Sequence, residues 1–288
     1  MKKLIILLFA LVTCNAVCAQ SCLPEGITFK TQVQIDNFQT NYPGCTKIEG
    51  DVTISGYESI TNLRGLSSLI SIGGGLSILN NHLLASLTGL DNLISLGGGL
   101  TIAGNGILPS LKGLERLLNI GGLRIYNNYV LSSLTGLDNL KTIGGDLQIS
   151  YNDALTSLKG LDNLKTIGGS LQISHTKLTN FMGLDKLDSI GGGLAISNND
   201  NLISLTGLNN LIFIRGNLSI GVCWSYPVGI ICGGNPFLIN LIGLDKLASI
   251  GGNLEINANN SLKNLTGQFY RWIFYCYGKL CNHQFNWA

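Results

Sequence analysis

Charged residues are scarce in this chain of 288 residues: Asp, Glu, Lys and Arg make up 12% of it, against about 25% in an ordinary soluble domain. Without the N-terminal Lys2 and Lys3, 16 basic residues stand against 16 acidic ones. A protein that binds nucleic acid carries a basic stripe or patch. Because no such stripe occurs here, nucleic acid is not an expected partner.

Long apolar runs are also lacking, apart from one near the N-terminus. That run, Leu4 to Val12, follows Lys2 and Lys3 and precedes the small residue Ala19. This order is typical of a secretory signal peptide, which we expect to comprise residues 1–19. The run is too short to span a bilayer. We therefore predict an exported protein, secreted or at the cell surface, with no membrane span in this chain.

Histidine is rare, and the three histidines do not form a catalytic pattern. They are His82, His175 and His283, while serine recurs as part of a repeat. An enzyme needs a nucleophile, a general base or a carboxylate pair at unique positions. The cysteines also lack the spacing of a zinc site, about two to four residues apart in matched halves. We therefore predict no enzyme activity, no metal and no cofactor.

Repetition is what the chain has in abundance. The run from Gly136 to Gly145 returns almost unchanged from Gly160 to Gly169, 24 residues later. A fixed period of this length is the signature of a solenoid, in which each repeat forms one coil stacked on the last. The Gly-Leu pairs of successive repeats lie 23 or 24 residues apart, with one gap of 36. They begin at Gly65, Gly89, Gly113, Gly136, Gly160, Gly183, Gly207 and Gly243.

Within each repeat, a short apolar alternation predicts one β-strand. Leu147 and Ile149 alternate with polar residues, which is the period-two pattern of a strand. Such strands, stacked in register, form a parallel sheet. We therefore predict a mainly β solenoid of about nine coils of ~24 residues over residues 51–267. Equivalent Leu-x-Ile pairs begin at Leu76, Leu100, Leu123, Leu171, Leu194, Leu218 and Leu254.

Two further repeat positions have predicted structural roles. The double glycine before each strand, such as Gly144-Gly145, is expected to take a positive φ at the corner. A phosphate-binding loop is the alternative, but such a loop occurs once, between a strand and a helix. An asparagine after each strand is expected to point inward and bond buried backbone groups, with His175 in its place in one shortened coil. These asparagines are Asn81, Asn105, Asn128, Asn152, Asn199, Asn235 and Asn259.

A row of acidic residues follows the Gly-Leu pairs. Stacked carboxylates can bind calcium, but the glycine-rich nonapeptide of calcium-binding solenoids is missing. An acid that opens a short turn can instead accept hydrogen bonds from free backbone amides. We predict this capping role for Asp91, Glu115, Asp138, Asp162, Asp185 and Asp245.

The segment before the repeats, residues 20–50, is predicted to form an N-terminal helical cap. Thr31 and Gln34 have the form of a capping box, which places a helix start near Thr31. Pro43-Gly44 is expected to end the helix. The first strand is then expected within Cys45 to Ile54. The side chains expected to face the first coil are those of Val33, Phe38 and Tyr42.

Six cysteines remain outside the signal peptide, and in an exported protein they are expected to form disulfides. Fifteen pairings are possible, and sequence proximity favours three local pairs. Within the signal peptide, Cys14 or Cys18 is an alternative lipid-attachment site, but the residues before them fit a lipoprotein signal poorly. The favoured pairs are Cys22–Cys45, Cys223–Cys232 and Cys276–Cys281.

The opening of the solenoid resembles that of the receptor L domain, the ligand-binding solenoid of the insulin and epidermal growth factor receptors. In both, a cysteine-clipped helix leads into a Cys-x-x-Ile-x-Gly-x-Leu-x-Ile run, here Cys45 to Ile54 with Val52 in the leucine place. The resemblance spans Cys22 to Leu265 and implies a right-handed parallel β-helix of leucine-rich-repeat character, with binding by surface residues. The receptors' cysteine-rich module and kinase are missing, so growth-factor binding is not implied. The Lys-Lys signal and stand-alone solenoid look more like bacterial exported members of the family.

Two surfaces are candidates for binding. The 36-residue gap holds an insertion, residues 221–233, which carries Trp224 and Tyr226. Aromatic residues on a loop that leaves a rigid scaffold often form a contact site; the alternative is that they fold back onto the solenoid. The second surface is the outer face of the sheet. Its outward side chains are expected to include Arg124, Tyr126, Gln148 and Gln172.

The last residues depart from the repeat. Residues 268–288 hold eight aromatic residues and form either an aromatic cap or the product of a frameshift. The sequence as a whole predicts a secreted or cell-surface module that binds an unknown protein or glycan, without catalysis, through the solenoid surface and the inserted loop. The alternatives are a passive spacer or a fragment of a longer surface protein and, third, a polysaccharide-active β-helix enzyme.

Overall fold

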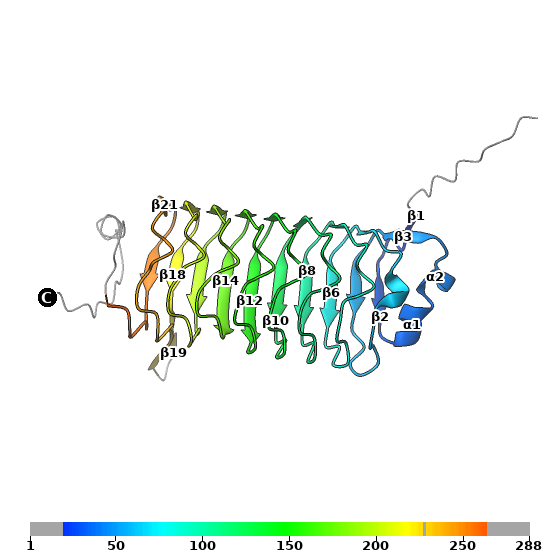
Figure 1. Ribbon diagram of the computed structural model, residues 1–288, viewed down its shortest axis with the longest axis horizontal. Coiled ribbons are helices and arrows are strands. Elements are labelled where there is room, and N and C mark those ends of the chain that lie inside the picture. Colours follow the sequence, from blue (N-terminus) through cyan, green and yellow to red (C-terminus); the bar gives the residue numbers. More distant parts are fainter. Residues whose placement is uncertain (1–19, 227–228, 264–288) are drawn as a thin grey trace, which may run out of the picture.

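The computed structural model describes residues 20–226 and 229–263, without the side chains of residues 223–232. The expected signal peptide (1–19), the tail (268–288) and the Cys276–Cys281 pair therefore lie outside the described residues. The described chain is a solenoid of parallel strands, elongated along the stacking direction, with short helices at its N-terminal end (Figure 1). The predicted mainly β solenoid is confirmed.

One side of the solenoid is a ten-stranded sheet, called the main sheet below. Each strand pairs in parallel with the strand of the next coil, and Leu147 pairs with Leu123 on one side and Leu171 on the other. The predicted Leu-x-Ile strands are confirmed. In sheet order they are β2 (Ile27–Phe29), β4 (Val52–Ile54), β6 (Leu76–Leu79), β8 (Leu100–Ala103), β10 (Leu123–Tyr126), β12 (Leu147–Asn152), β14 (Leu171–Thr176), β16 (Leu194–Ser197), β18 (Leu218–Ile220) and β22 (Leu254–Ile256).

Shorter strands form two further parallel sheets on another side of the coils. The four-stranded sheet contains β1 (Gln20–Cys22), β3 (Cys45–Ile48), β5 (Ser71–Ile72) and β7 (Ser95–Leu96). The six-stranded sheet contains β9 (Asn119–Ile120), β11 (Thr142–Ile143), β13 (Thr166–Ile167), β15 (Ser189–Ile190), β17 (Phe213–Ile214) and β21 (Ser249–Ile250).

The sheets enclose an apolar core because leucine and isoleucine recur at the inward positions of every coil. Their buried side chains form one continuous cluster along the described chain; in one coil they include fully buried Leu137, Leu140 and Ile143. A single coil offers too little apolar burial to offset the entropy of ordering its backbone. Stacking covers each inner coil on both sides, so the fold is stable only as an array.

The corner glycines act differently from what we predicted. Gly144 and Gly145 have no positive φ. The glycine of every Gly-Leu pair after Gly65 holds that conformation, as at Gly136 with φ 115°. Most double-glycine positions instead allow close packing between coils: a Cβ on Gly168 would collide with the carbonyl oxygen of Gly144, whereas a Cβ on Gly144 would have room. The predicted positive φ at the double glycine is therefore wrong, and the distance between backbones explains the residue choice.

The asparagines that follow the strands form the predicted internal ladder. Asn128 is fully buried. Its Nδ2 donates to the carbonyl oxygen of Ile102 (2.9 Å), and its Oδ1 accepts from the backbone N–H of Asn105 (3.1 Å). Equivalent bonds link the other ladder asparagines to their neighbouring coils. Each side chain thus satisfies buried backbone groups that would otherwise lack partners.

Thr176, and not His175 as predicted, holds the ladder position in the shortened coil. Thr176 pairs with Asn152 in the sheet, is buried, and donates from Oγ1 to Oδ1 of Asn199 (2.8 Å). The missing residue therefore falls after the ladder position. His175 lies one place earlier, beside Tyr151 of the preceding coil.

The N-terminal cap contains α1 (Gln32–Asp36) and α2 (Phe38–Asn41), and the 3₁₀ helix η1 (Arg64–Leu66) follows in the chain. Thr31 caps α1, and the predicted capping box with Gln34 is present. In the part of the chain that the structure describes, no helix has both the length and the apolar character to cross a membrane.

Packing of the cap differs from the prediction at two points. Phe38 is buried and Tyr42 packs against the core, but Val33 is 65% exposed and Ile35 faces inward in its place. In addition, strand β2 of the main sheet precedes α1, so the solenoid begins before Cys45. Contacts with the first coil, and not helical period alone, decide which face of such a short helix is buried.

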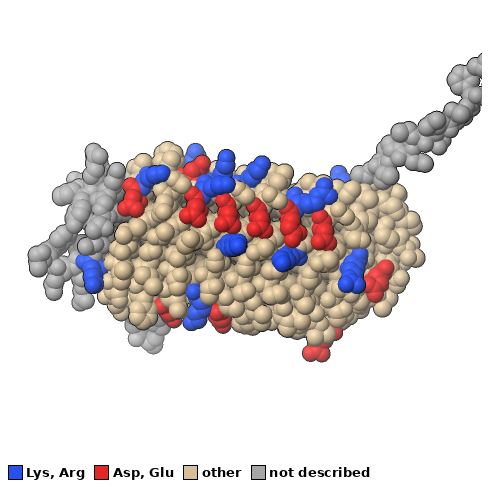
Figure 2. Space-filling model, in the orientation of Figure 1, with Lys and Arg blue, Asp and Glu red and all other residues tan. Residues whose placement is uncertain are grey.

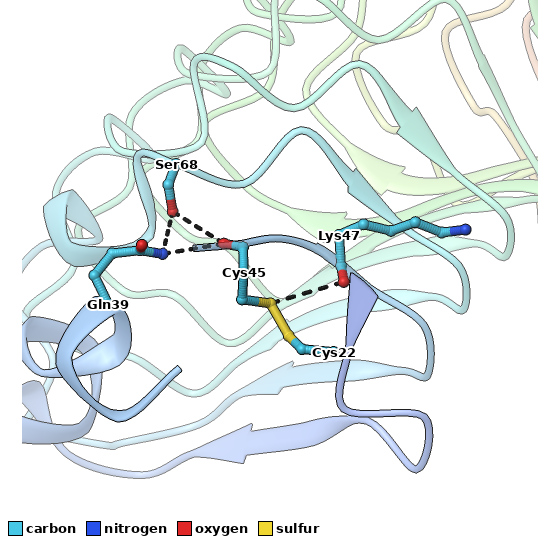
Figure 3. Close-up of a disulfide and its surroundings, with 5 residues drawn as sticks. All are labelled: Cys22, Gln39, Cys45, Lys47 and Ser68. Atoms are coloured by element: carbon cyan, nitrogen blue, oxygen red, sulfur yellow. Dashed lines mark hydrogen bonds between the residues drawn. A yellow bond between two sulfur atoms is a disulfide. The ribbon is translucent and has the colours of Figure 1, made fainter. Parts of the chain in front are cut away.

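The predicted Cys22–Cys45 disulfide is present and joins β1 to β3 (Figure 3). Beside it, Nε2 of Gln39 donates to the carbonyl oxygen of Cys45 (3.1 Å), which ties α2 to the same strand (Figure 3).

Removing this disulfide is expected to destabilise the fold. The bridge closes a loop with a sequence separation of 23 residues. The double variant Cys22→Ala/Cys45→Ala should lower the free energy of unfolding by about 3 kcal/mol, because the bridge restricts the unfolded chain. Urea titration followed by circular dichroism measures this loss. Val33→Ala, in the exposed part of the same cap, is the control and should leave the midpoint unchanged; equal midpoints for all three proteins contradict the prediction.

Candidate functional site

The outer face of the main sheet carries mostly small side chains. In strands β4 to β18 the first apolar residue and the isoleucine two places later are buried, so the residues between and after them point outward. Long polar side chains interrupt this pattern on three consecutive strands, β10, β12 and β14, where Gln148 lies between Arg124 and Gln172. The outward residues that follow the first apolar residue of strands β4 to β22 are Thr53, Ser77, Thr101, Arg124, Gln148, Gln172, Ala195, Ser219 and Glu255.

Three ring-bearing side chains lie beside this polar row. Tyr126 follows Arg124 by two residues and shares its face of β10. Tyr151 and His175 lie near the ends of β12 and β14, and their rings stack with centroids 4.1 Å apart and planes at 20°. Tyr151 remains 49% exposed. We call the set Arg124, Tyr126, Gln148, Tyr151, Gln172 and His175 the central cluster.

The backbone beneath the stacked pair is unusual for these residue types. Tyr151 has φ 55° and His175 has φ 52°. A left-handed conformation costs an ordinary residue about 1–2 kcal/mol, whereas glycine and asparagine adopt it readily. Strain of this kind concentrates at functional sites, so the pair is a candidate for function. In five other coils the same corner holds Asn80, Gly104, Asn127, Asn198 or Ala258, so the conformation belongs to the repeat and the residue types are what distinguish this pair.

The central cluster borders an open hollow of about 610 Å³ on the outer face of the main sheet. Four members of the cluster line the hollow directly, so guanidinium, amide and phenol groups converge on it. They are Arg124, Tyr126, Gln148 and Tyr151. A second hollow of about 370 Å³ shares Thr101 and Arg124 with the first and extends toward β4. The first hollow is lined by Thr101, Arg124, Tyr126, Asn127, Gln148, Ser150 and Tyr151.

A further hollow, about 750 Å³, lies over the six-stranded sheet. Phe213, which is 48% exposed, and Arg215 are its only aromatic and charged lining residues. The remaining lining residues are Ser, Thr, Gly and Ile. Fewer polar groups converge here than around the central cluster, so we rank this hollow below it.

The insertion forms an antiparallel hairpin of β19 (Val222–Tyr226) and β20 (Gly229–Gly233), which projects from the solenoid near its C-terminal end (Figure 1). Cys223 lies opposite Cys232 in this hairpin. The side chains of Trp224 and Tyr226 lie outside the described residues, so their role and the second disulfide stay predictions. The hairpin follows β18 in the chain, and in sheet order β16 separates β18 from β14, the last strand of the predicted outer-face surface.

Acidic side chains form a row along the solenoid, with basic side chains beside them (Figure 2). The predicted capping role is confirmed: Asp138 Oδ2 accepts from the backbone N–H of Gly136 at 2.7 Å, and five equivalent acids do the same in their coils. Among the described residues, no group of three His, Cys, Asp or Glu side chains is arranged to hold a metal ion. The row is therefore explained by its backbone contacts.

The sequence predicted four members of the central cluster as outward-facing, and the structure places them together on adjacent strands. It did not single out Tyr151, and it assigned His175 to the ladder. The sequence did contain a signal for Tyr151, because it stands at a corner where other coils have asparagine or glycine, such as Asn127 and Gly104. The stacking itself depends on register between residues 24 positions apart.

Comparison with known proteins bears on the centre of the solenoid. Residues 139–192 match the family model described as the receptor L domain. This segment contains Gln148, Tyr151, Gln172 and His175, and so most of the central cluster. Searches of curated proteins and of solved structures gave no match.

Proposed function

Since residues 139–192 are of the receptor L-domain family, we propose that this protein is an exported, non-catalytic module that binds a protein or a glycan through its central cluster. The observation that carries the proposal is that guanidinium, amide and stacked ring groups converge on one hollow. The other outward side chains of this sheet face are mostly small. The receptor L domain is a binding domain, which supports the same conclusion.

The chemistry of the central cluster suits recognition. Tyrosine and arginine dominate binding energy at interfaces because they combine large contact area with hydrogen-bonding groups. Gln148 and Gln172 add neutral donors and acceptors. The sheet holds these groups on adjacent paired strands, so little backbone freedom is lost when a ligand binds.

Export is supported by two features. The Cys22–Cys45 disulfide is of the kind that persists in oxidising compartments. The first 19 residues have the composition of a signal peptide. The hairpin residues Trp224 and Tyr226 are proposed as a second contact with the same partner or another one.

The proposal is tested by binding the labelled, full-length protein to an array of purified glycans and an array of purified extracellular proteins. Saturable binding to at least one of them is expected. Arg124→Ala and Tyr151→Ala should each weaken it about tenfold or more, as expected for central contacts. The matched control is Tyr57→Ala, which removes a tyrosine that is 63% exposed, has φ 51° and lies beside His82, far from the central cluster.

Two results contradict the proposal. If no glycan or protein binds saturably, the passive spacer becomes the better explanation. If binding survives both cluster variants but is lost in Trp224→Ala or Tyr226→Ala, the hairpin is the binding site and the central cluster is not.

A further inference from the structure

The two hollows on the outer face form one trough that runs across the strands. They share Thr101 and Arg124, and their linings reach from Asp51 and Thr53 at β4 to Tyr151 at β12. These strands are successive neighbours in the order β4, β6, β8, β10 and β12. At about 4.8 Å between strands, the trough is about 19 Å long, which suits an extended ligand lying along the solenoid axis.

The floor of the trough is open to close approach. Gly75, Gly99 and Gly122 line one margin and carry no side chains, while Ser77 and Thr101 offer only short hydroxyl groups. A ligand therefore meets backbone and hydroxyl groups for most of its length. The carbonyl oxygens of these glycines already accept N–H groups from the neighbouring strands. The uncharged donors and acceptors of the floor are therefore mainly its hydroxyl groups, and its apolar area is small.

One end of the trough has a different character, because Tyr126 and Tyr151 lie there. His175 covers one face of the Tyr151 ring and holds it in place, and the tyrosine is still 49% exposed. Aromatic rings offer a flat apolar surface with a polar edge. The flat C–H face of a sugar ring is complementary to this surface.

The charges along the trough are nearly balanced. Arg124 lies where the hollows meet, and Asp51 and Asp146 line the second hollow. Each of these carboxylates uses Oδ1 to accept a backbone N–H, from Gly75 (2.6 Å) and Ser170 (2.8 Å) respectively. Their Oδ2 atoms have no protein partner among the described residues and are suited to accept ligand hydroxyl groups. One cation between two carboxylates favours a neutral polar ligand over an anionic one.

A protein partner fits these observations less well. A stable protein interface buries about 800 Å² on each side around an apolar centre. Apart from the two tyrosines and Leu100, the trough is lined by charged, amide, hydroxyl and glycine residues, so it offers no apolar centre of this kind.

We propose that the trough binds a neutral, linear oligosaccharide lying across strands β4 to β12. One sugar ring packs against Tyr151 and Tyr126, Arg124 and Gln148 bond the central hydroxyl groups, and Asp51 and Asp146 accept hydroxyl hydrogens. This inference rests on the proposed binding function and names the ligand class.

The test is isothermal titration calorimetry on the full-length protein with defined probes. The neutral probes are the tetrasaccharides of cellulose, β-1,3-glucan, xylan, mannan and chitin; the acidic probe is tetragalacturonate; the short probes are the matching disaccharides. At least one neutral tetrasaccharide should bind saturably, about tenfold or more tighter than its disaccharide and than the acidic probe. The longer chain gains contacts along the trough that the disaccharide cannot make.

Variants locate the site. Thr101→Trp fills the junction of the two hollows and should abolish binding of the tetrasaccharide. Tyr151→Ala should weaken it about tenfold or more, and the control Tyr57→Ala should leave it unchanged. Circular dichroism and urea midpoints equal to those of the parent protein establish that each variant is folded. A second blocking variant, Ser77→Trp, replaces Thr101→Trp if that variant does not fold.

The outcomes separate this inference from the function on which it rests. If no neutral tetrasaccharide binds, or if binding persists in the folded blocking variant, the oligosaccharide assignment is wrong. If a purified protein then binds and is lost in Arg124→Ala, the binding function stands and only the ligand class fails. If neither class of ligand binds, both proposals fail.

Discussion

Replacing Asn128 by alanine is expected to lower the free energy of unfolding by about 3–5 kcal/mol. The side chain is fully buried and bonds its own coil and both neighbouring coils, since Nδ2 also donates to Oδ1 of Asn152 in the following coil (3.3 Å). It accepts from the backbone N–H of Asn105 (3.1 Å) and donates to the carbonyl oxygens of Ile102 (2.9 Å) and Tyr126 (3.1 Å). Alanine removes the side-chain partner of the Asn105 N–H and of the Ile102 carbonyl, and each buried group left unsatisfied costs about 1–3 kcal/mol. The Tyr126 carbonyl keeps a bond from the backbone N–H of Gly104. Urea titration by circular dichroism measures the loss.

Asn139→Ala is the matched control for this experiment. Asn139 lies in the neighbouring coil, is exposed, and makes a single hydrogen bond from Nδ2 to the carbonyl oxygen of Glu115 (2.8 Å). Its loss should change stability by no more than about 0.5 kcal/mol, as is usual for a surface substitution. If the two variants lose equal stability, the ladder does not stabilise the fold by forming hydrogen bonds with buried backbone groups.

Replacing Gly136 by alanine is expected to destabilise the protein by about 3–5 kcal/mol, the sum of backbone strain and overpacking. Gly136 has φ 115°, a conformation that L-residues rarely adopt. An added Cβ would also collide with the carbonyl group of Leu111 in the preceding coil. Neither problem can be relieved locally, because the neighbouring coil is held by the paired strands. The unfolding midpoint in urea gives the measurement.

Gly144→Ala provides the comparison within the same coil. Gly144 has no positive φ, and a Cβ there would lie 3.6 Å from the nearest atom, the carbonyl oxygen of Gly121. The substitution should be neutral or stabilise the protein by about 0.4–1 kcal/mol, because alanine restricts the unfolded chain. A large loss at Gly144 together with a small one at Gly136 would show that the double glycine, and not the Gly-Leu pair, supports the corner.

The candidate site shows where sequence reasoning was sufficient and where it was not. The outward positions of Arg124, Gln148 and Gln172 follow from strand alternation once the repeat is aligned, because the side-chain period of a strand is two. The stacking of Tyr151 on His175 does not follow, since it depends on the backbone conformation at two corners. The hollow that these residues border exists only after the coils are stacked.

The sequence by itself determined the solenoid, the strand of each coil, the asparagine ladder, the capping acids and the Thr31 capping box. All of these depend on local periodicity or on contacts between residues one repeat apart, which the repeat makes visible. The tertiary structure alone decided which glycines need a positive φ, that Ile35 and not Val33 faces the core, and that Thr176 continues the ladder. These outcomes depend on how closely neighbouring backbones approach and in what register they stack, and neither quantity is encoded in the pattern of a single coil.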